Sequence, residues 1–210
     1  MPELRLTTQS PLADITHTNR QGSPDANAGV SIAVRSGLAL ASVMARRHAT
    51  DTLARRVKEV FDIGLPREPR RNCARDISFA WAGPGHWLAV AEATEGHAWV
   101  ARLRTGLSGL ASVSEQTDGR VVIRIRGPNA RGTLAKGLPI DLHRRAFQPG
   151  YAAVSVIGHI GIHLWQVDDQ PSYEMAVPTS YARSFWYWIA NAAAEFGISV
   201  ETAGDLHIAR

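Results

Sequence analysis

The chain has 210 residues, of which 45% are hydrophobic and 20% charged, a balance typical of a globular protein that buries a substantial core. A single cysteine excludes an internal disulfide and indicates a reducing, cytoplasmic compartment, while the polar N-terminal stretch predicts no secretory signal and no apolar run approaches the roughly 18 residues of a membrane span. The net charge is only +4 and acidic residues are interspersed throughout, which argues against a nucleic-acid-binding protein.

The basic residues are almost all arginine: among 23 lysines and arginines, only Lys58 and Lys136 are lysine. Codon usage in a GC-rich genome explains this bias and also enriches alanine and glycine. Arginine equally suits protein interfaces, because its guanidinium group pairs bidentately with carboxylates and phosphates. The sequence alone leaves both explanations open.

The first half of the chain begins with a polar, aperiodic stretch, residues 1–29, which predicts a mobile N-terminal arm. SIAVRSGLALASVMARR, from Ser31, predicts one strand, and TDTLARRVKEVFDIG predicts a helix because its apolar residues recur on one face. REPRRNCARD then reads as a charged loop. ISFAWAGPGHWLAVAE alternates on either side of GPG and predicts a hairpin, and GHAWVARLRTGL predicts a second helix.

The second half repeats this order. RVVIRIRG predicts a strand, PNARGTLAK a short helix that Gly137 closes, and YAAVSVIGHIGIHLWQV a long strand that turns at DDQPS into SYEMAV. TSYARSFWYWIANAAAEFG predicts a closing amphipathic helix that Gly197 ends.

Two successive β-α-β-β-α units fit a parallel sheet with helices on both faces poorly. They predict an α+β fold with antiparallel or mixed sheets and helices packed on one face. The expected divisions are the arm at 1–29, a first lobe at 30–118, a second lobe at 119–200 and a C-terminal tail at 201–210.

Three patterns resemble catalytic or ligand sites and lack a necessary part. Gly127 and Gly132 have the spacing of a phosphate-binding loop, but threonine stands where the loop lysine is needed. His159 and His163 have metal-site spacing only on a helix, since four strand residues span roughly 13 Å. No nucleotide-binding glycine motif and no cysteine-based metal site is present.

Asp141 and His143 lie in the stretch KGLPIDLHRRAFQPG, between Lys136 and Gly150, and could form an acid–base pair. No nucleophile elbow or oxyanion site accompanies them, and a bracing role for both side chains accounts for them equally well. On the last predicted helix, Trp186 falls outside the apolar stripe, as an indole at a partner interface would.

Three segments together resemble the γ subunit of heterotetrameric sarcosine oxidase. They are WAGPGHWL (Trp81–Leu88), RIRGPNARGTLAKGLPIDLHRRAF (Arg124–Phe147) and EMAVPTSYARSFWYWIANAAAEFG (Glu174–Gly197), in the family's order. Arg144, where the family often has proline, and Thr179, where it often has arginine, depart from the pattern and put partner contacts in doubt.

The resemblance implies a two-lobed, aminomethyltransferase-like fold and a role as a subunit without catalytic, cofactor-binding or metal-binding residues of its own. The implied partners are the α, β and δ subunits, which are expected to hold FAD, FMN, NAD, tetrahydrofolate and zinc. The implied complex demethylates sarcosine to glycine, with peroxide and methylene-tetrahydrofolate or formaldehyde as co-products. We expect no nucleic-acid or membrane partner.

A partner interface is expected at eight residues: Arg126, Arg131, Asp141, His143, Arg144, Arg145, Phe147 and Trp186. Within the 136–150 loop, Asp141 would bond backbone amides and Phe147 would fill a core or partner pocket, leaving the two arginines facing outward. Two alternatives remain: a sister complex such as N-methylglutamate dehydrogenase, and a stand-alone folate-binding protein with Asp118 or Asp141 as its pterin-binding carboxylate.

Overall fold

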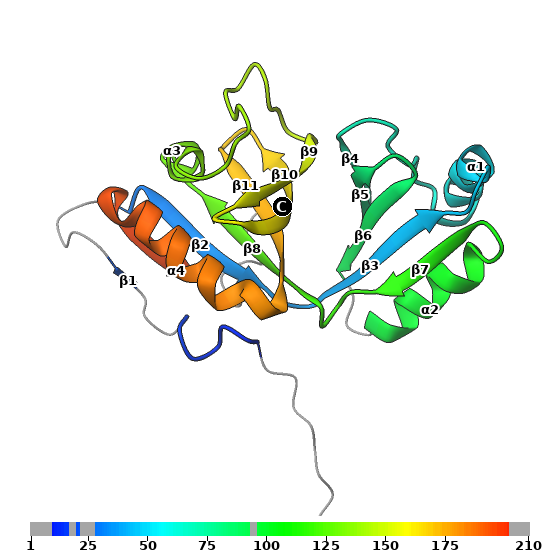
Figure 1. Ribbon diagram of the computed structural model, residues 1–210, viewed down its shortest axis with the longest axis horizontal. Coiled ribbons are helices and arrows are strands. Elements are labelled where there is room, and N and C mark those ends of the chain that lie inside the picture. The colour runs from blue at the N-terminus through cyan, green and yellow to red at the C-terminus, as the bar shows by residue number, and fades with distance from the viewer. Residues whose placement is uncertain (1–9, 17–19, 22–27, 93–95, 202–210) are drawn as a thin grey trace, which may run out of the picture.

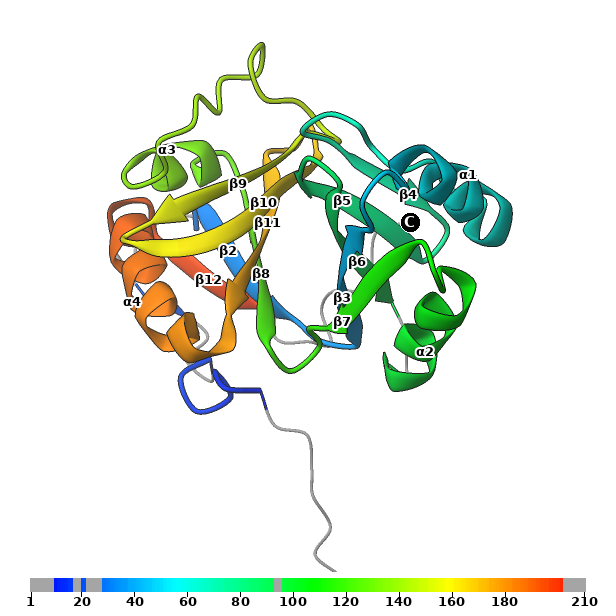
Figure 2. The same ribbon diagram turned by 45° about the vertical axis from the view of Figure 1, so that its right-hand side comes forward.

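The computed structural model describes residues 10–16, 20–21, 28–92 and 96–201. In this part of the chain the strands form two sheets, with helices at the two outer sides (Figures 1 and 2). The predicted α+β class is therefore confirmed. None of the helices among these residues is long and apolar enough to cross a bilayer.

The smaller sheet is antiparallel and lies in the order β4-β5-β6-β3-β7. Its strands are β3 (Leu38–Ala45), β4 (Arg71–Ala74), β5 (Ile77–Gly83), β6 (His86–Glu92) and β7 (Ala111–Glu115). Helices α1 (Thr50–Phe61) and α2 (Gly96–Gly106) pack on one face of it and enclose a core of buried apolar side chains. The hairpin predicted around GPG is β5–β6.

The larger sheet lies in the order β1-β12-β2-β8-β11-β10-β9 and is antiparallel except for the β12–β2 pair. Its strands are β1 (Arg20–Gln21), β2 (Val30–Arg35), β8 (Arg120–Arg126), β9 (Ala152–Ile157), β10 (Ile160–Asp168), β11 (Ser172–Pro178) and β12 (Ile198–Glu201). Helices α3 (Ala130–Ala135) and α4 (Ala182–Ala193) and the short 3₁₀ turns η1 (Thr179–Tyr181) and η2 (Ala194–Phe196) accompany it. The helices cover one face over a second core.

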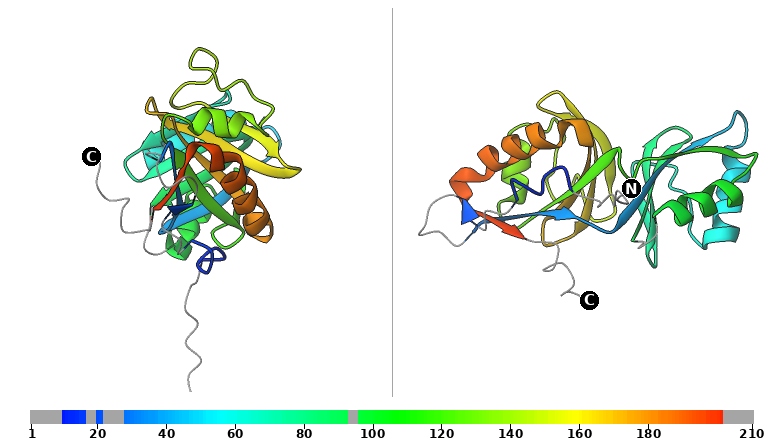
Figure 3. Two further views of the ribbon diagram at one scale, coloured as in Figure 1. Left: turned by 90° about the vertical axis from the view of Figure 1, so that its left-hand side faces the viewer. Right: turned by 90° about the horizontal axis from the view of Figure 1, so that it is seen from below.

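The two sheets meet through the faces that carry no helices. A third cluster of buried side chains lies there, with Trp165 of β10 at 0% exposure and Leu88 of β6 at 2%. The view from below shows strands of the two sheets side by side at the middle of the molecule, with the helices away from this junction (Figure 3). Polar side chains flank this apolar patch, and they form the candidate site described below.

The segment predicted as one strand from Ser31 is two strands in different sheets. The chain turns at Gly37, whose φ of 68° places it in the left-handed region that glycine tolerates, and β3 then enters the smaller sheet. Strand β2 pairs with β8 of the larger sheet. The expected first lobe at 30–118 therefore does not coincide with the smaller sheet, which begins at Leu38.

The predicted long strand at 151–167 is a hairpin, β9–β10. Its turn residues Gly158 and His159 both have positive φ, 54° and 69°, the backbone of a tight two-residue hairpin turn. His159 thus lies in the turn and His163 in β10. Strands β4, β7 and β12 were not predicted either. Because of these strands and this hairpin, the observed element order differs from the predicted doubled β-α-β-β-α order.

Part of the expected mobile arm is folded against the larger sheet. Leu12 is fully buried in its core, and Asp14 forms an ion pair with Arg183 of α4. The prediction of mobility is wrong for residues 10–16, because an apolar side chain followed by a charge pair anchors them. The rest of the arm and the tail after Glu201 lie largely outside the described residues.

Gly137 tests how closely the 136–150 loop packs on α4. A Cβ at this position would meet the Trp188 ring at 2.5 Å, whereas a Cβ at Gly161 would meet nothing within 4 Å. We expect Gly137→Ala to lower the free energy of unfolding by about 1–3 kcal/mol, the usual cost of overpacking, and Gly161→Ala to change it by less than about 0.5 kcal/mol. Urea denaturation of both variants measures the difference, and equal effects would contradict the close packing.

Candidate functional site

The predicted interface loop is braced from within and anchored by one aromatic side chain. Asp141 Oδ1 accepts a hydrogen bond from the backbone N–H of His143 at 2.8 Å. Phe147 is 5% exposed and its ring centroid lies 5.7 Å from that of Tyr151 and 6.4 Å from that of Tyr173. The side chain therefore fills this chain's own core. Asp141, His143, Arg144 and Arg145 are exposed.

Of the other predicted interface residues, two arginines form hydrogen bonds within the chain and one tryptophan is buried. Arg131 donates from Nε to the Tyr173 hydroxyl at 2.9 Å, and Arg126 donates from Nε to Glu201 Oε1 at 2.9 Å, so both make contacts within the chain. The placement of Trp186 at an exposed interface is wrong, since it is 3% exposed in the larger core.

Helix α4 buries a wider face than the predicted stripe. Two successive residues, Phe185 and Trp186, are both buried, and the exposed aromatics near it are Tyr181 and Tyr187, at 54% and 57%. An apolar face at least 100° wide, as on most helices that cover a core, takes in adjacent positions.

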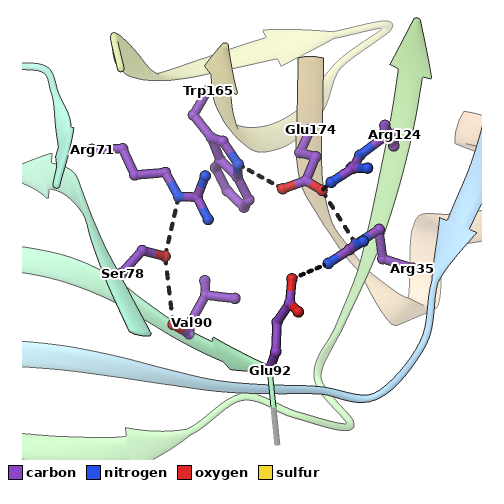
Figure 4. A network of polar contacts seen from close by, with 8 residues as sticks. All are labelled: Arg35, Arg71, Ser78, Val90, Glu92, Arg124, Trp165 and Glu174. Carbon is purple, nitrogen blue, oxygen red and sulfur yellow. Dashed lines mark hydrogen bonds and ion pairs between the residues drawn. The ribbon is translucent and has the colours of Figure 1, made fainter. Parts of the chain in front are cut away.

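A buried carboxylate, Glu174, is the centre of a polar network between the two sheets (Figure 4). Glu174 lies on β11, is 3% exposed, and stands opposite Arg124 of β8 and Trp165 of β10 in the sheet register. Arg124 donates to Glu174 Oε1 from Nε at 2.9 Å and from Nη2 at 2.6 Å. The indole N–H of Trp165 donates to Oε2 at 2.8 Å.

Arg35, at the end of β2, extends this network across to the smaller sheet. Its Nε lies 3.3 Å from Glu174 Oε1, and its Nη2 donates to Glu92 Oε1 of β6 at 2.5 Å. The guanidinium thus joins a carboxylate of the larger sheet to one of the smaller sheet, at the point where the chain passes from one sheet to the other.

Arg71 of β4 approaches the same centre from the smaller sheet. Its Nε donates to Ser78 Oγ at 3.1 Å, and its guanidinium carbon lies 5.2 Å from the ring centroid of Trp165. Its backbone N–H also donates to the carbonyl of Gly150 at 2.7 Å. Side chain and backbone of Arg71 therefore both link the smaller sheet to the larger unit.

The surrounding guanidinium groups keep Glu174 ionised. Burial raises the pKa of its carboxyl, but the charges of Arg124, Arg71 and Arg35, with the hydrogen bonds from Arg124, more than offset this and hold the pKa below its usual range. A carboxylate with a lowered pKa is a poor general acid or base near neutral pH. The arrangement is therefore suited to bracing the larger sheet where it meets the smaller one.

The network borders a pocket of about 160 Å³ between the sheets. Its lining is rich in arginine and contains the single cysteine, which is exposed. The residues are Arg35, Leu38, Arg71, Cys73, Arg75, Asp76, Ile77, Ser78, Val90, Glu92, Arg124, Val167 and Glu174. Among the described residues, no group of three or more His, Cys, Asp or Glu side chains is placed to hold a metal ion.

A second polar cluster flanks the inter-sheet patch, formed by residues of β3, β6, β8 and β10. The Ser42 hydroxyl lies 2.7 Å from His86 Nε2, a pairing of the kind that activates serine nucleophiles. No carboxylate of the described residues bonds the other nitrogen of His86. Arg120 Nε and His163 Nδ1 are buried without a hydrogen-bond partner in the described chain. The orienting group of a catalytic triad is thus missing.

Glu174 and Glu92 offer a matched test of the network, because both contact Arg35 and differ in burial. Glu174→Gln should lower the free energy of unfolding by about 3–5 kcal/mol, since it leaves two half-buried guanidinium groups, those of Arg35 and Arg124, without their carboxylate. Glu92→Gln should lower the free energy of unfolding by at most about 1 kcal/mol, because the Glu92 side chain is 63% exposed. Urea denaturation at pH 7 gives both values. Equal losses would mean that the buried Glu174 contributes no more to stability than the exposed Glu92.

His163 should make stability depend on pH. Burial, with the charges of Arg120 and His86, lowers the pKa of His163 from 6.5 to about 4, so the folded state favours the neutral ring. Burial and Arg120 lower the pKa of His86 in the same direction. The unfolded chain binds the proton more readily, and stability should therefore fall between about pH 6.5 and pH 4, by up to about 3 kcal/mol from His163.

The His163 contribution is isolated by comparing His163→Gln with His159→Asn, which removes the exposed imidazole of the same hairpin. Urea midpoints from pH 7 to pH 4 should fall less steeply for His163→Gln than for the parent chain, and in parallel with the parent for His159→Asn. Identical slopes in all three proteins would refute the assignment.

Known proteins resemble this chain in sequence and in fold. The family model "Sarcosine oxidase, gamma subunit family" matches residues 45–195. "Sarcosine oxidase subunit gamma" of Corynebacterium sp. (strain P-1) is 32% identical over 66% of this chain and 68% of the relative, and that of Arthrobacter sp is 29% identical over 63% and 66%. The chain thus spans about two thirds of the length of these relatives.

Among solved structures, a chain of the heterotetrameric sarcosine oxidase from Corynebacterium sp. U-96 matches with a TM-score of 0.77 at 22% identity, over 90% of this chain and 96% of that one. The glycine cleavage system aminomethyltransferase T of Bartonella henselae matches with 0.59 at 16% identity, over 84% and 48%. Both likenesses bear on the fold, which is the expected aminomethyltransferase-like one. On the family model and the relatives together, this chain belongs to the sarcosine oxidase gamma subunit family.

Proposed function

We propose that this chain is a structural subunit of a heterotetrameric sarcosine oxidase and supplies no catalytic residue to it. Family membership is the observation that carries the proposal. The chemistry of the inter-sheet groups supports the second part. The Glu174 carboxylate is occupied by internal donors, and the Ser42–His86 pair has no orienting carboxylate among the described residues.

The partners in this proposal are α, β and δ subunits, which would carry FAD, FMN, NAD, tetrahydrofolate and zinc. The complex would oxidise sarcosine to glycine and form peroxide, with methylene-tetrahydrofolate or formaldehyde as the one-carbon product. A cytoplasmic location belongs to the same proposal, and the exposed free thiol of Cys73 fits a reducing compartment.

Folate binding by this chain itself has less support from the structure than the role of a structural subunit. It would need a carboxylate held toward a pterin, and the two candidates are Asp118 and Asp141. Both are exposed, and Asp141 is engaged by the backbone of its own loop. Neither lines the pocket between the sheets.

The 136–150 loop is the docking element that the proposal assigns to this chain. The loop between α3 and β9 stands out from the body of the protein (Figures 1 and 2). Phe147 anchors the loop in the core, while Arg144 and Arg145, three and two positions before it, are exposed. Two adjacent exposed guanidinium groups suit carboxylates on a neighbouring subunit.

Purification of the tagged chain from its native host tests the proposal. Co-purifying subunits with flavin absorbance, and peroxide formed on addition of sarcosine, are expected. Flavin absorbance with turnover of another N-methyl amino acid would assign the chain to a sister complex. A colourless chain that purifies alone would refute the subunit role.

Charge reversal tests the docking loop in the same experiment. The double variant Arg144→Glu/Arg145→Glu should co-purify at least about tenfold less partner protein, because like charges would then face each other across the interface. The matched control is Arg55→Glu/Arg56→Glu on exposed positions of α1, which should assemble normally. Both variants should unfold at the parent urea concentration, so a loss of assembly would report on docking. Undiminished assembly of the loop variant would place the interface elsewhere.

A further inference from the structure

The pocket between the sheets has a surplus of positive charge. Four arginines and three carboxylates line it: Arg35, Arg71, Arg75 and Arg124, with Asp76, Glu92 and Glu174. Counted over the whole lining, the guanidinium groups outnumber the carboxylates by one. Arg75, Asp76 and Glu92 are exposed, so Arg35, Arg71, Arg124 and Glu174 form the inner part.

Arg71 is the inner guanidinium without an ion pair of its own, although its charge helps to lower the pKa of Glu174 from a longer distance. Arg124 is paired with Glu174, and Arg35 with both Glu174 and Glu92. Among the described residues, no carboxylate lies within ion-pair distance of Arg71, whose Nε is bonded to the Ser78 hydroxyl. Both terminal nitrogens of its guanidinium are therefore available to an acceptor oxygen.

Arg71 is held in position without a directly bonded carboxylate. The Ser78 hydroxyl, which itself donates to the carbonyl of Val90 at 3.4 Å, fixes one edge of the guanidinium, and the Trp165 ring lies against it (Figure 4). A guanidinium that is partly removed from water without a carboxylate is unfavourable. A preorganised, unpaired guanidinium beside a pocket is an anion-binding arrangement.

Pocket size and walls define the class of anion. The volume, about 160 Å³, far exceeds the roughly 10–15 Å³ that one water needs and lies below the roughly 300 Å³ at which pockets for drug-sized ligands begin. Leu38, Ile77, Val90 and Val167 supply apolar walls. The occupant is thus small, with a short apolar part.

We propose that this pocket binds a small monocarboxylate with a short aliphatic tail, its carboxylate received by Arg71. The acidic side chains nearby restrict the ligand to a single negative charge. Glu174 is already satisfied by Arg124 and Trp165, and Glu92 is largely exposed, so neither blocks a monoanion. The inference rests on the chain's own charges and is independent of the proposed role in sarcosine oxidase.

Nuclear magnetic resonance of the ¹⁵N-labelled full chain tests the proposal. The indole N–H of Trp165, assigned with Trp165→Phe, lies beside Arg71 and reports on the pocket. Sodium propionate, titrated at constant ionic strength against sodium chloride, should shift this resonance saturably. Propionamide, the neutral molecule of the same shape, should not. Absence of a saturable shift with propionate, or an equal shift with propionamide, would overturn the proposal.

Arg71→Gln should weaken propionate binding at least about tenfold, because it removes the charged donor, whereas Arg55→Gln on α1 should leave binding unchanged. If Arg71→Gln fails to fold, Ser78→Ala, which frees the guanidinium without removing it, should weaken binding several-fold. If Arg71→Gln folds and still binds propionate, the assignment is overturned. If Arg71→Gln does not fold, undiminished binding by Ser78→Ala overturns it. In the assembled complex, propionate should also slow alkylation of Cys73 by iodoacetamide, measured on its peptide.

Discussion

The polar network centred on Glu174, which Arg35 carries across from the larger sheet to Glu92 of the smaller one, is the constraint on which the relative placement of the two sheets depends. Each sheet buries its helix-bearing face in its own core, so neither needs the other for that purpose. The shared cluster between them is small and contains three alanines. A buried charge has few permissible positions, because every lost donor leaves an uncompensated carboxylate. Packing thus brings the faces together, and the network fixes how they meet.

The covalent connections reinforce the same junction. Strand β2 ends at Arg35 in the larger sheet, and β3 begins three residues later in the smaller one. On the other side of the junction, the backbone of Arg71 bonds Gly150, at the base of the 136–150 loop. The loop that we propose for docking is therefore tied directly to the inter-sheet network. The position of the loop, and so of any partner bound to it, therefore depends on both sheets.

Periodicity and turn chemistry predicted the four α-helices and the β5–β6 hairpin, because these depend on local spacing. The same rules missed the break at Gly37 and the turn at Gly158, where continuous apolar residues concealed a change of strand. The short strands β4, β7 and β12 were missed because sheet pairing, and not their own composition, makes them strands.

The predicted site residues and the observed polar centre differ for a physical reason. Loop residues such as Asp141 and Arg144 stand out in a sequence because charged residues gather beside glycine and proline. Glu174 lies within the apolar run SYEMAV, and only three-dimensional pairing brings it to arginines 50 and 139 positions earlier in the chain, Arg124 and Arg35. A lone acid in an otherwise apolar strand was the available signal, since such a residue must find donors when the strand is buried.

The division between an exposed loop and a buried network separates two demands on this chain. A subunit that docks needs surface charges that bind another protein, as at Arg144 and Arg145. Replacing such charges leaves the subunit's own fold intact. A junction that positions two sheets needs charges that are satisfied internally, as at Glu174. Arg71 belongs to the junction by position but lacks its own carboxylate. It is therefore the point at which a small anion, by completing the charge balance between the sheets, would stiffen the base of the docking loop.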